Sequence, residues 1–209
     1  MADLEALAEA VIKGDQNAAV EITRQAIADE MPAKEILDTG LIAAMSTVGD
    51  RFSRNEIYIP EVLIAARAMK SATTILEPEL VKAGVEPIGK FIVGTVAGDL
   101  HDIGKNIVGM MMKGAGFEII DMGVDVSPQA YLEKAKETGA QLVGLSALLT
   151  TTMPSMEKTI KAFKDAGLST KIMIGGAPVT QAYADKIGAD GYSADAASAV
   201  DVAKGLIAA

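Results

Sequence analysis

The chain has 209 residues, of which 50% are hydrophobic and 22% charged, with a formal net charge of −9. This acidic balance argues against nucleic acid or an anionic membrane as a partner. The absence of cysteine excludes disulfides, thiolate metal ligands and a cysteine nucleophile. The start of the chain lacks the pattern of a signal peptide, and apolar runs such as 91–97 are too short to cross a bilayer. We therefore expect a soluble cytoplasmic protein.

Residues 1–83 have the periodicity of helices. Apolar residues recur at three- and four-residue steps in four stretches, at 4–11, 19–27, 36–45 and 60–80. The polar segment 50–59 predicts a loop, after which Pro60 opens the fourth helix. Four helices with short connections predict an antiparallel bundle. The Gly- and Pro-containing segment 84–89 predicts a linker.

The period changes in residues 90–209. Short apolar runs lie at 90–97, 117–121, 142–146, 171–174 and 191–192. Helical patterns separate them at about 104–115, 128–138, 153–166, 178–187 and 195–207. This alternation is typical of a parallel sheet with helices on both faces. We predict a five-stranded flavodoxin- or Rossmann-like domain, which binds ligands beyond the carboxyl ends of its strands.

The only histidine, His101, follows the first predicted strand. A lone histidine in a loop is most often a solvated side chain. Asp99, two residues earlier, favours a metal ligand, because such a histidine usually donates its other ring N–H to a carboxylate. Gly104 would let a bulky group approach the backbone.

One histidine cannot form an ordinary zinc site, which needs three or four protein ligands. A single protein ligand suits a metal that arrives in a macrocycle, as iron does in haem. The sequence has 11 methionines. We expect most of them to fill the core as flexible apolar side chains. The alternative is that a few line a pocket for a large flat ligand.

Two further segments follow predicted strands. Ser146, Thr150 and Thr152 come after the third strand, where hydroxyl residues either cap a helix or bind a polar ligand tail. Gly175 and Gly176 follow the fourth strand, where a tight turn or close approach to a ligand would each need glycine.

The combined spacing of Asp99-x-His101-x-x-Gly104, Ser146-x-Leu148 and Gly175-Gly176 resembles the cobalamin-binding motif. This motif occurs in methionine synthase, the B12-dependent mutases and the corrinoid proteins of methyltransferase systems. Residues 48–70 resemble the helical cap that precedes the motif in methionine synthase and in the small corrinoid proteins. The resemblance therefore covers most of the chain and is closest to corrinoid proteins of methylamine, methanol or betaine demethylation.

The resemblance implies a cobalamin, methylcobalamin or a related corrinoid, bound with its own base displaced and His101 as the axial cobalt ligand. Asp99 would hold the other ring nitrogen, and Thr152 would take the place of the serine usual at its position. The remaining implied contacts around the cofactor are Leu100, Asp102, Ile103, Gly104, Ser146, Leu148, Thr150, Gly175 and Gly176. Phe52 and Ile59 match residues that cover the upper face of the corrin.

The implied function is that of a methyl carrier rather than of an enzyme acting alone. Cobalt(I) accepts a methyl group from a substrate-specific methyltransferase. A second methyltransferase then passes the group to a folate, pterin or thiol, and a reductive activase is a further expected partner. The resemblance implies a cap domain at 1–83, a linker at 84–89 and a cobalamin-binding domain at 90–209.

Two other functions stay open at this point. A cobalamin-binding sensor would share the motif but would normally need an output domain. A flavodoxin-like receiver or nucleotide-binding module would need neither cobalamin nor His101, but the chain lacks Gly-x-Gly-x-x-Gly after its first strand.

Overall fold

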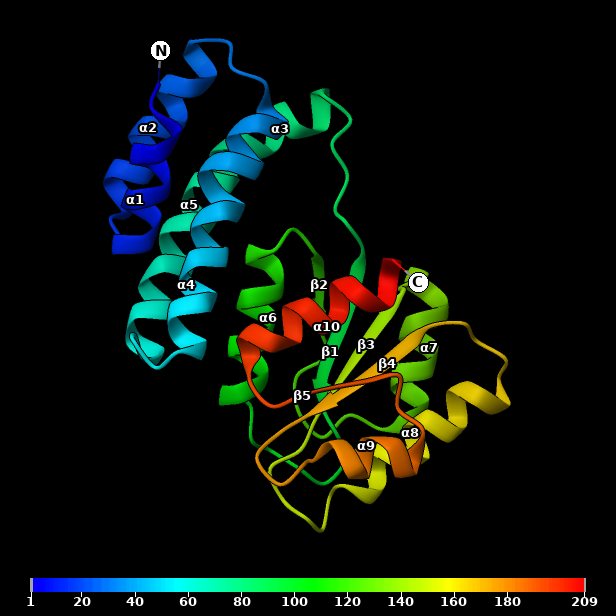
Figure 1. Ribbon diagram of the computed structural model, residues 1–209. Helices are drawn as coiled ribbons and strands as arrows, with labels where there is room; N and C mark the ends of the chain where they lie inside the picture. The colour runs from blue at the N-terminus through cyan, green and yellow to red at the C-terminus, as the bar shows by residue number, and fades with distance from the viewer. Residues whose placement is uncertain (1, 209) are drawn as a thin grey trace. The chain divides into compact units, whose positions relative to one another are not determined.

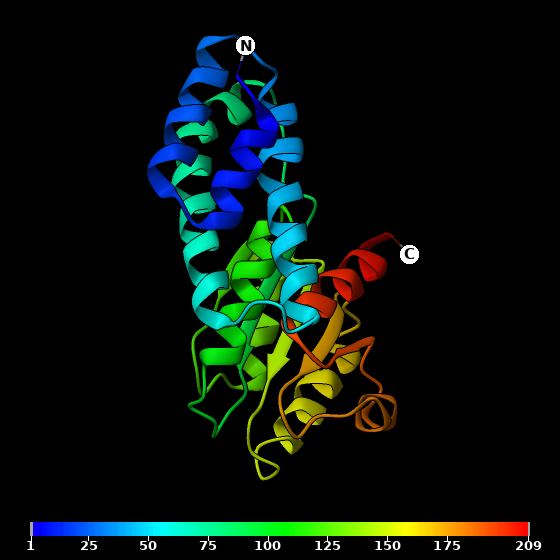
Figure 2. The ribbon, with the colours of Figure 1, turned by 60° about the vertical axis from the view of Figure 1, so that its left-hand side comes forward.

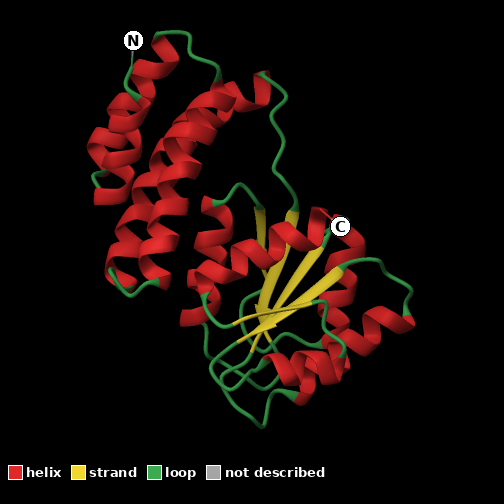
Figure 3. Cartoon of the chain, viewed as in Figure 1, coloured by secondary structure: helices red, strands yellow, loops and turns green. Residues whose placement is uncertain are grey.

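The computed structural model describes residues 2–208 and divides into two compact units (Figure 1). The first unit runs up to Pro87 and includes Gly114–Gly116. The second unit holds Ile88–Lys113 and the chain from Phe117 onward. The first is helical, and the second is built on a sheet (Figure 3).

The helical unit contains the elements α1 (Leu4–Lys13), α2 (Gln16–Ala28), α3 (Ala33–Glu35), η1 (Ile36–Ile42), α4 (Ala43–Ser53) and α5 (Ile59–Lys82). From α3 to α4 the helix runs without a break, and η1 is a stretch with wider, π-helical turns. The side chains of Asp3 and Asp15 accept backbone N–H bonds at the starts of α1 and α2, which satisfies amides that a helix leaves free. Four long helices are thus present, as predicted.

The predicted loop at 50–59 is wrong over its first part, because α4 continues to Ser53. Polar residues do not stop a helix whose inner face is apolar, and Met45 and Val48 of α4 are buried. The helix ends at Ser53, and Asn55, two residues later, has a left-handed φ of 57°. The next helix then begins at Ile59, with Pro60 in its first turn.

The second unit holds one sheet of strands β1 (Lys90–Thr95), β2 (Glu118–Asp121), β3 (Leu142–Ser146), β4 (Lys171–Gly175) and β5 (Gly191–Ser193). The strand order is β2-β1-β3-β4-β5 and all pairs are parallel. The strand order reverses at β1, because β2 lies on one side of this strand and β3 on the other. The five predicted strands are confirmed, with β1 shorter than expected because Val96 leaves the strand to form an isolated bridge with Val126.

Five helices cover the sheet: α6 (Ile103–Gly114), α7 (Pro128–Thr138), α8 (Pro154–Asp165), α9 (Gln181–Ile187) and α10 (Ala196–Ala208). The helices α6 and α10 lie on one face, and α7, α8 and α9 on the other (Figures 1 and 2). Alternate strand residues such as Ile92, Val143 and Ile172 pack in the core under α7–α9. Met111 and Met112 of α6 are buried, as core filling predicts. The predicted doubly covered parallel sheet is confirmed.

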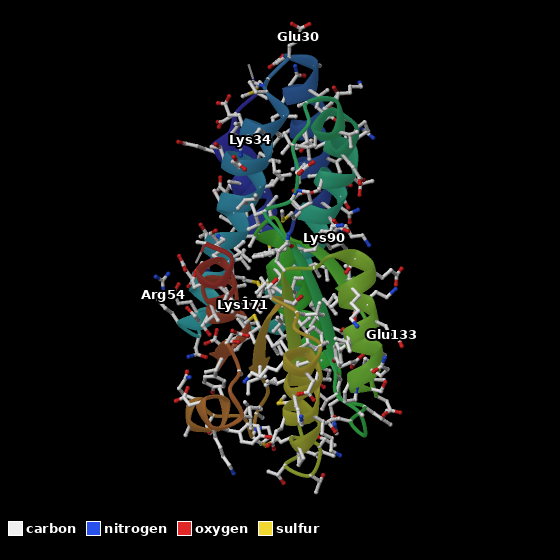
Figure 4. All side chains as sticks on the ribbon, turned by 90° about the vertical axis from the view of Figure 1, so that its right-hand side faces the viewer. Glu30, Lys34, Arg54, Lys90, Glu133 and Lys171 are labelled. Carbon is white, nitrogen blue, oxygen red and sulfur yellow. The ribbon has the colours of Figure 1, made fainter. Side chains whose placement is uncertain are left out.

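Most charged side chains are exposed, with Asp99 and Lys105 as buried exceptions. Glu133 of α7 and Glu30, just after α2, are exposed and point outward (Figure 4). Within residues 2–208, no helix combines the length and apolar character that crossing a bilayer requires.

Candidate functional site

The segment 96–102, here termed the ligand loop, follows the carboxyl end of β1. Strand β3 pairs with β1 so that Thr95 is opposite Ser146. The residues that follow the two strands therefore meet at one edge of the sheet. This edge lies where the strand order reverses, which is where open α/β sheets bind ligands.

Asp99 and His101 form the central pair of the ligand loop. Oδ1 of Asp99 lies 2.7 Å from Nδ1 of His101 and also accepts the His101 backbone N–H at 3.1 Å. The Asp99 side chain is completely buried, whereas 51% of the His101 side chain is exposed. Among residues 2–208, none makes a hydrogen bond with Nε2 of His101.

The other oxygen of Asp99 binds the loop that follows β3. Oδ2 accepts the Leu148 amide at 2.8 Å, the Leu149 amide at 3.2 Å and the Thr152 hydroxyl at 2.7 Å. That hydroxyl also lies 2.8 Å from the Leu149 carbonyl oxygen. Because it has one proton and an ionised carboxylate is the stronger acceptor, the proton goes to Asp99. Hydrogen bonds therefore connect His101 to Asp99 and Asp99 to Thr152 without a gap.

These hydrogen bonds determine which atom of the pair holds the proton that lies between them. Burial by itself would raise the pKa of Asp99, but the Leu148 amide, the His101 ring and the Thr152 hydroxyl outweigh it and hold this pKa well below its usual range. An ionised Asp99 can only accept, so Nδ1 of His101 carries the proton. The lone pair of the neutral ring is then on Nε2, which is the metal-ligand tautomer.

The backbone of the ligand loop is tied to the sheet. The buried Thr95 hydroxyl donates to the His101 carbonyl at 2.8 Å, and the Ser155 hydroxyl donates to the Ala97 carbonyl at 3.1 Å. The loop after β2 also holds it, through Asp125. The sequence did not predict these roles of Thr95 and Asp125. The one feature that points to Thr95 in the sequence is that it is a polar residue within an apolar strand.

Exposed apolar side chains occur on the segments that meet at Asp99 and His101. Leu100 and Ile103 are 72% and 69% exposed, and Leu148 and Leu149 are more than 40% exposed. Large exposed apolar side chains that flank one polar group are typical of a ligand site. Asp102 differs, because its carboxylate accepts from Asn106 in the first turn of α6.

The remaining predicted residues occupy different environments. Gly104 has nothing within 4 Å of the place a Cβ would take. Ser146 and Thr150 make no side-chain hydrogen bond within residues 2–208. Gly176, with a φ of 128°, follows β4, and a Cβ there would collide with the Ala147 carbonyl, so this glycine is needed by the fold itself. Gly175 ends β4 beside it. Phe52 and Ile59 belong to the helical unit.

These features fit a metal held in a macrocycle. No group of three or more His, Asp or Glu that could hold a bare ion occurs among residues 2–208. Among residues 2–208 one imidazole nitrogen has no hydrogen-bond partner, and a buried carboxylate orients the ring. The adjoining segments carry exposed apolar side chains and an open glycine. A large, mostly apolar ligand that brings its own metal matches this set of groups.

Comparison with protein families gives two matches. A family described as a B12 binding domain matches residues 89–201, and a second family with the same description matches residues 3–77. Dimethylamine corrinoid protein 3 of Methanosarcina acetivorans is 45% identical over 99% of this chain and 100% of its own length.

Two solved structures are similar over almost the whole chain. A cobalamin-binding protein from Desulfitobacterium hafniense is 35% identical with a TM-score of 0.83, and the match covers 99% of each chain. The methanol:cobalamin methyltransferase complex from Methanosarcina barkeri contains a chain that is 26% identical with a TM-score of 0.87. That match covers 98% of this chain and 79% of the other.

Proposed function

Because the chain belongs to the corrinoid proteins of methyltransferase systems and has cobalamin or a related corrinoid as its cofactor, we propose that it carries methyl groups between two methyltransferases with His101 as the axial cobalt ligand. The cofactor would be bound with its own base displaced. The observation that carries this proposal is the half-exposed imidazole whose Nδ1 is held 2.7 Å from a fully buried carboxylate.

When bound, the cofactor supplies a cobalt centre that accepts and releases a methyl group. His101 would hold the cobalt, and the protein would orient its ring. Asp99 keeps the proton on Nδ1 of His101, and Thr152 keeps Asp99 in place. Leu100, Ile103 and Leu148 are exposed and would offer apolar surface to the cofactor.

The polar tail of the cofactor would be held by residues at the same edge of the sheet. Ser146 and Thr150 have hydroxyls with no side-chain hydrogen bond among the described residues, and such groups gain most from a ligand partner. Gly104 leaves open space, and Gly175 and Gly176 bring the backbone close to the same edge. Asp102 would stabilise the first turn of α6 beside them.

For the helical unit we propose the role of a cap over the upper face of the cofactor, with Phe52 and Ile59 in contact with it. In support, Ile59 is 39% exposed at the start of α5 although it is apolar. The segment 84–89 would be the hinge; in support, the boundary between the two units falls within it, after Pro87, and Gly84 has a left-handed φ.

The proposed partners are a substrate-specific methyltransferase, a second methyltransferase for a folate, pterin or thiol acceptor, and a reductive activase. We also propose a cytoplasmic location. Relatives named for dimethylamine, and a structure named for methanol, make methylated amines and methanol the first donors to test.

The test begins with apoprotein and hydroxocobalamin. The wild type is expected to retain the cofactor through gel filtration, and the cobalt(II) form should show nitrogen coupling from an imidazole in its paramagnetic resonance spectrum. Labelling the single histidine with ¹⁵N should change that coupling, and labelled His101→Ala should show no ¹⁵N coupling. Coupling that is the same with and without the ¹⁵N label in the wild type would refute His101 as the ligand.

Methyl transfer separates a carrier from a sensor. The reduced complex is mixed with a candidate methyltransferase and a methylated amine or methanol. Methylation of the bound cofactor within a catalytic turnover time is expected of a carrier. If the protein retained cobalamin but no methyltransferase encoded by an adjacent gene methylated it, a sensor would be indicated instead.

A further inference from the structure

We infer that Asp125 is a positioning residue for the axial histidine, acting through the backbone of Gly98 and Asp99. This inference rests on the proposed function, since it assumes that His101 ligates cobalt. Asp125 belongs to the loop that follows β2, and no part of the cobalamin motif in this sequence includes it.

Two hydrogen bonds join Asp125 to consecutive residues of the ligand loop. Oδ1 of Asp125 accepts the Gly98 amide at 2.7 Å, and the Asp125 amide donates to the Asp99 carbonyl at 3.0 Å. These two bonds hold the peptide groups on either side of the Gly98–Asp99 unit, because the Gly98 amide belongs to the peptide group before it and the Asp99 carbonyl to the one after it. Together they restrict where the Asp99 side chain leaves the backbone.

The loop that carries Asp125 is itself fixed to β1. The Thr95 amide donates to the Gly123 carbonyl at 3.0 Å, and the Val126 amide donates to the Thr95 carbonyl at 3.0 Å. Asp125 has a left-handed φ of 53° and Gly98 one of 84°. A non-glycine residue in this conformation is uncommon and is kept where the surroundings require it, often next to ligands.

The geometry leads from Asp125 to the metal ligand by a short route. Displacement of Asp99 would stretch the 2.7 Å contact with Nδ1 of His101 and the 2.7 Å bond from Thr152 at the same time. A carboxylate behind a ligating histidine sets both its orientation and its basicity. Asp125 makes no other side-chain hydrogen bond within residues 2–208. A substitution of its side chain therefore removes this one bond to the ligand loop.

The experiment measures the dissociation constant of hydroxocobalamin for the full chain. Asp125→Ala removes the acceptor, and Asp125→Gly removes it while also relieving the left-handed conformation. Each is expected to weaken binding by about tenfold, as other outer partners of metal ligands do. Asp125→Asn keeps an acceptor oxygen and is expected to stay within about twofold of the wild type.

Asp190 provides a matched control. Its Oδ2 accepts the Ile172 amide at 2.8 Å at the amino end of β4, so Asp190→Ala also deletes a carboxylate-to-amide bond in this unit. It lies away from the ligand loop, and its effect on cobalamin affinity is expected to be within about twofold. Equal weakening by the Asp125 and Asp190 variants would show a general loss of stability and would overturn the inference.

A double-mutant cycle with His101→Ala decides whether Asp125 acts through the ligand. If it does, Asp125→Gly should weaken binding about tenfold in the wild-type background and by less than about twofold beside His101→Ala. Equal weakening in both backgrounds, or none in either, would overturn the inference. Failure of the wild type to bind cobalamin would instead refute the proposed function, so the two failures are distinguishable.

Discussion

Thr152 and His101 contact the two oxygens of one buried carboxylate. The Thr152 hydroxyl donates to Oδ2 of Asp99 at 2.7 Å, and Oδ1 lies 2.7 Å from Nδ1 of His101. These residues come from segments after different strands, β3 and β1, so the contact also ties two loops together at the edge of the sheet.

The first prediction concerns Thr152→Val, which keeps the shape of the side chain but removes the hydroxyl. Asp99 is completely buried and cannot replace this bond with water. The free energy of unfolding should fall by about 2 kcal/mol, the scale for a hydrogen bond to a charged group. Urea unfolding of the apoprotein measures it.

Thr152→Ser is the control, because it keeps the hydroxyl and removes one methyl group. It should lose less than about 1 kcal/mol, the scale of one buried methylene. If both variants lost the same amount, packing of the methyl group would explain the effect and the bond to Asp99 would not.

The second prediction uses Gly104, near the start of α6. A Cβ at this position meets nothing within 4 Å, and alanine in a helix gains about 0.5–1 kcal/mol over glycine. Gly104→Ala should therefore be as stable as the wild type or more so. If Gly104 borders the cofactor, the added methyl should weaken cobalamin binding about tenfold, in line with the cost of overpacking.

Gly109 lies on the same helix and gives the comparison. A Cβ there makes ordinary contacts with Ile119 and Val93, so Gly109→Ala should change stability similarly without changing cobalamin affinity. Unaltered affinity in Gly104→Ala would remove Gly104 from the site.

The periodicity of the sequence predicted the sheet well because its strands are buried on both faces and appear as apolar runs. The Asp99–His101 pair was predictable because its members are two residues apart. Thr95 and Asp125 were not, because their bonds to the ligand loop depend on which strands become neighbours. The error at 50–53 has another cause: composition does not show where an exposed helix end stops.

The third prediction concerns the ion pair of Lys105 and Asp121. Nζ of Lys105 lies 2.6 Å from both oxygens of Asp121, yet the Lys105 side chain is 2% exposed and that of Asp121 48%. Asp121→Asn leaves a buried ammonium without its counter-charge and should cost about 3 kcal/mol. Lys105→Met leaves a carboxylate that water can reach and should cost about 1 kcal/mol or less. Urea unfolding of both variants tests the asymmetry, and equal losses would contradict it.

The last prediction compares two tyrosines that pack at the same core. Tyr131 of α7 is fully buried, and its hydroxyl has no hydrogen-bond partner within residues 2–208. Burial, with a smaller effect of the Asp121 charge, raises the pKa of Tyr131 above its usual range, so the phenol stays neutral. An unpaired buried hydroxyl costs about 1–3 kcal/mol. Tyr131→Phe should therefore raise the free energy of unfolding by about 1 kcal/mol, after the loss of contacts made by the oxygen.

Tyr183→Phe should change the free energy of unfolding in the opposite direction. The Tyr183 hydroxyl donates to the Met153 carbonyl at 2.8 Å, and removing it should lower the free energy of unfolding by about 1 kcal/mol. Because both substitutions delete one oxygen from a tyrosine at this core, the difference between them isolates the hydrogen bond. The urea midpoint at constant m value measures each change. If Tyr131→Phe destabilised the protein as much as Tyr183→Phe, the Tyr131 hydroxyl would have a partner, and a buried water over β1 would be the first to look for.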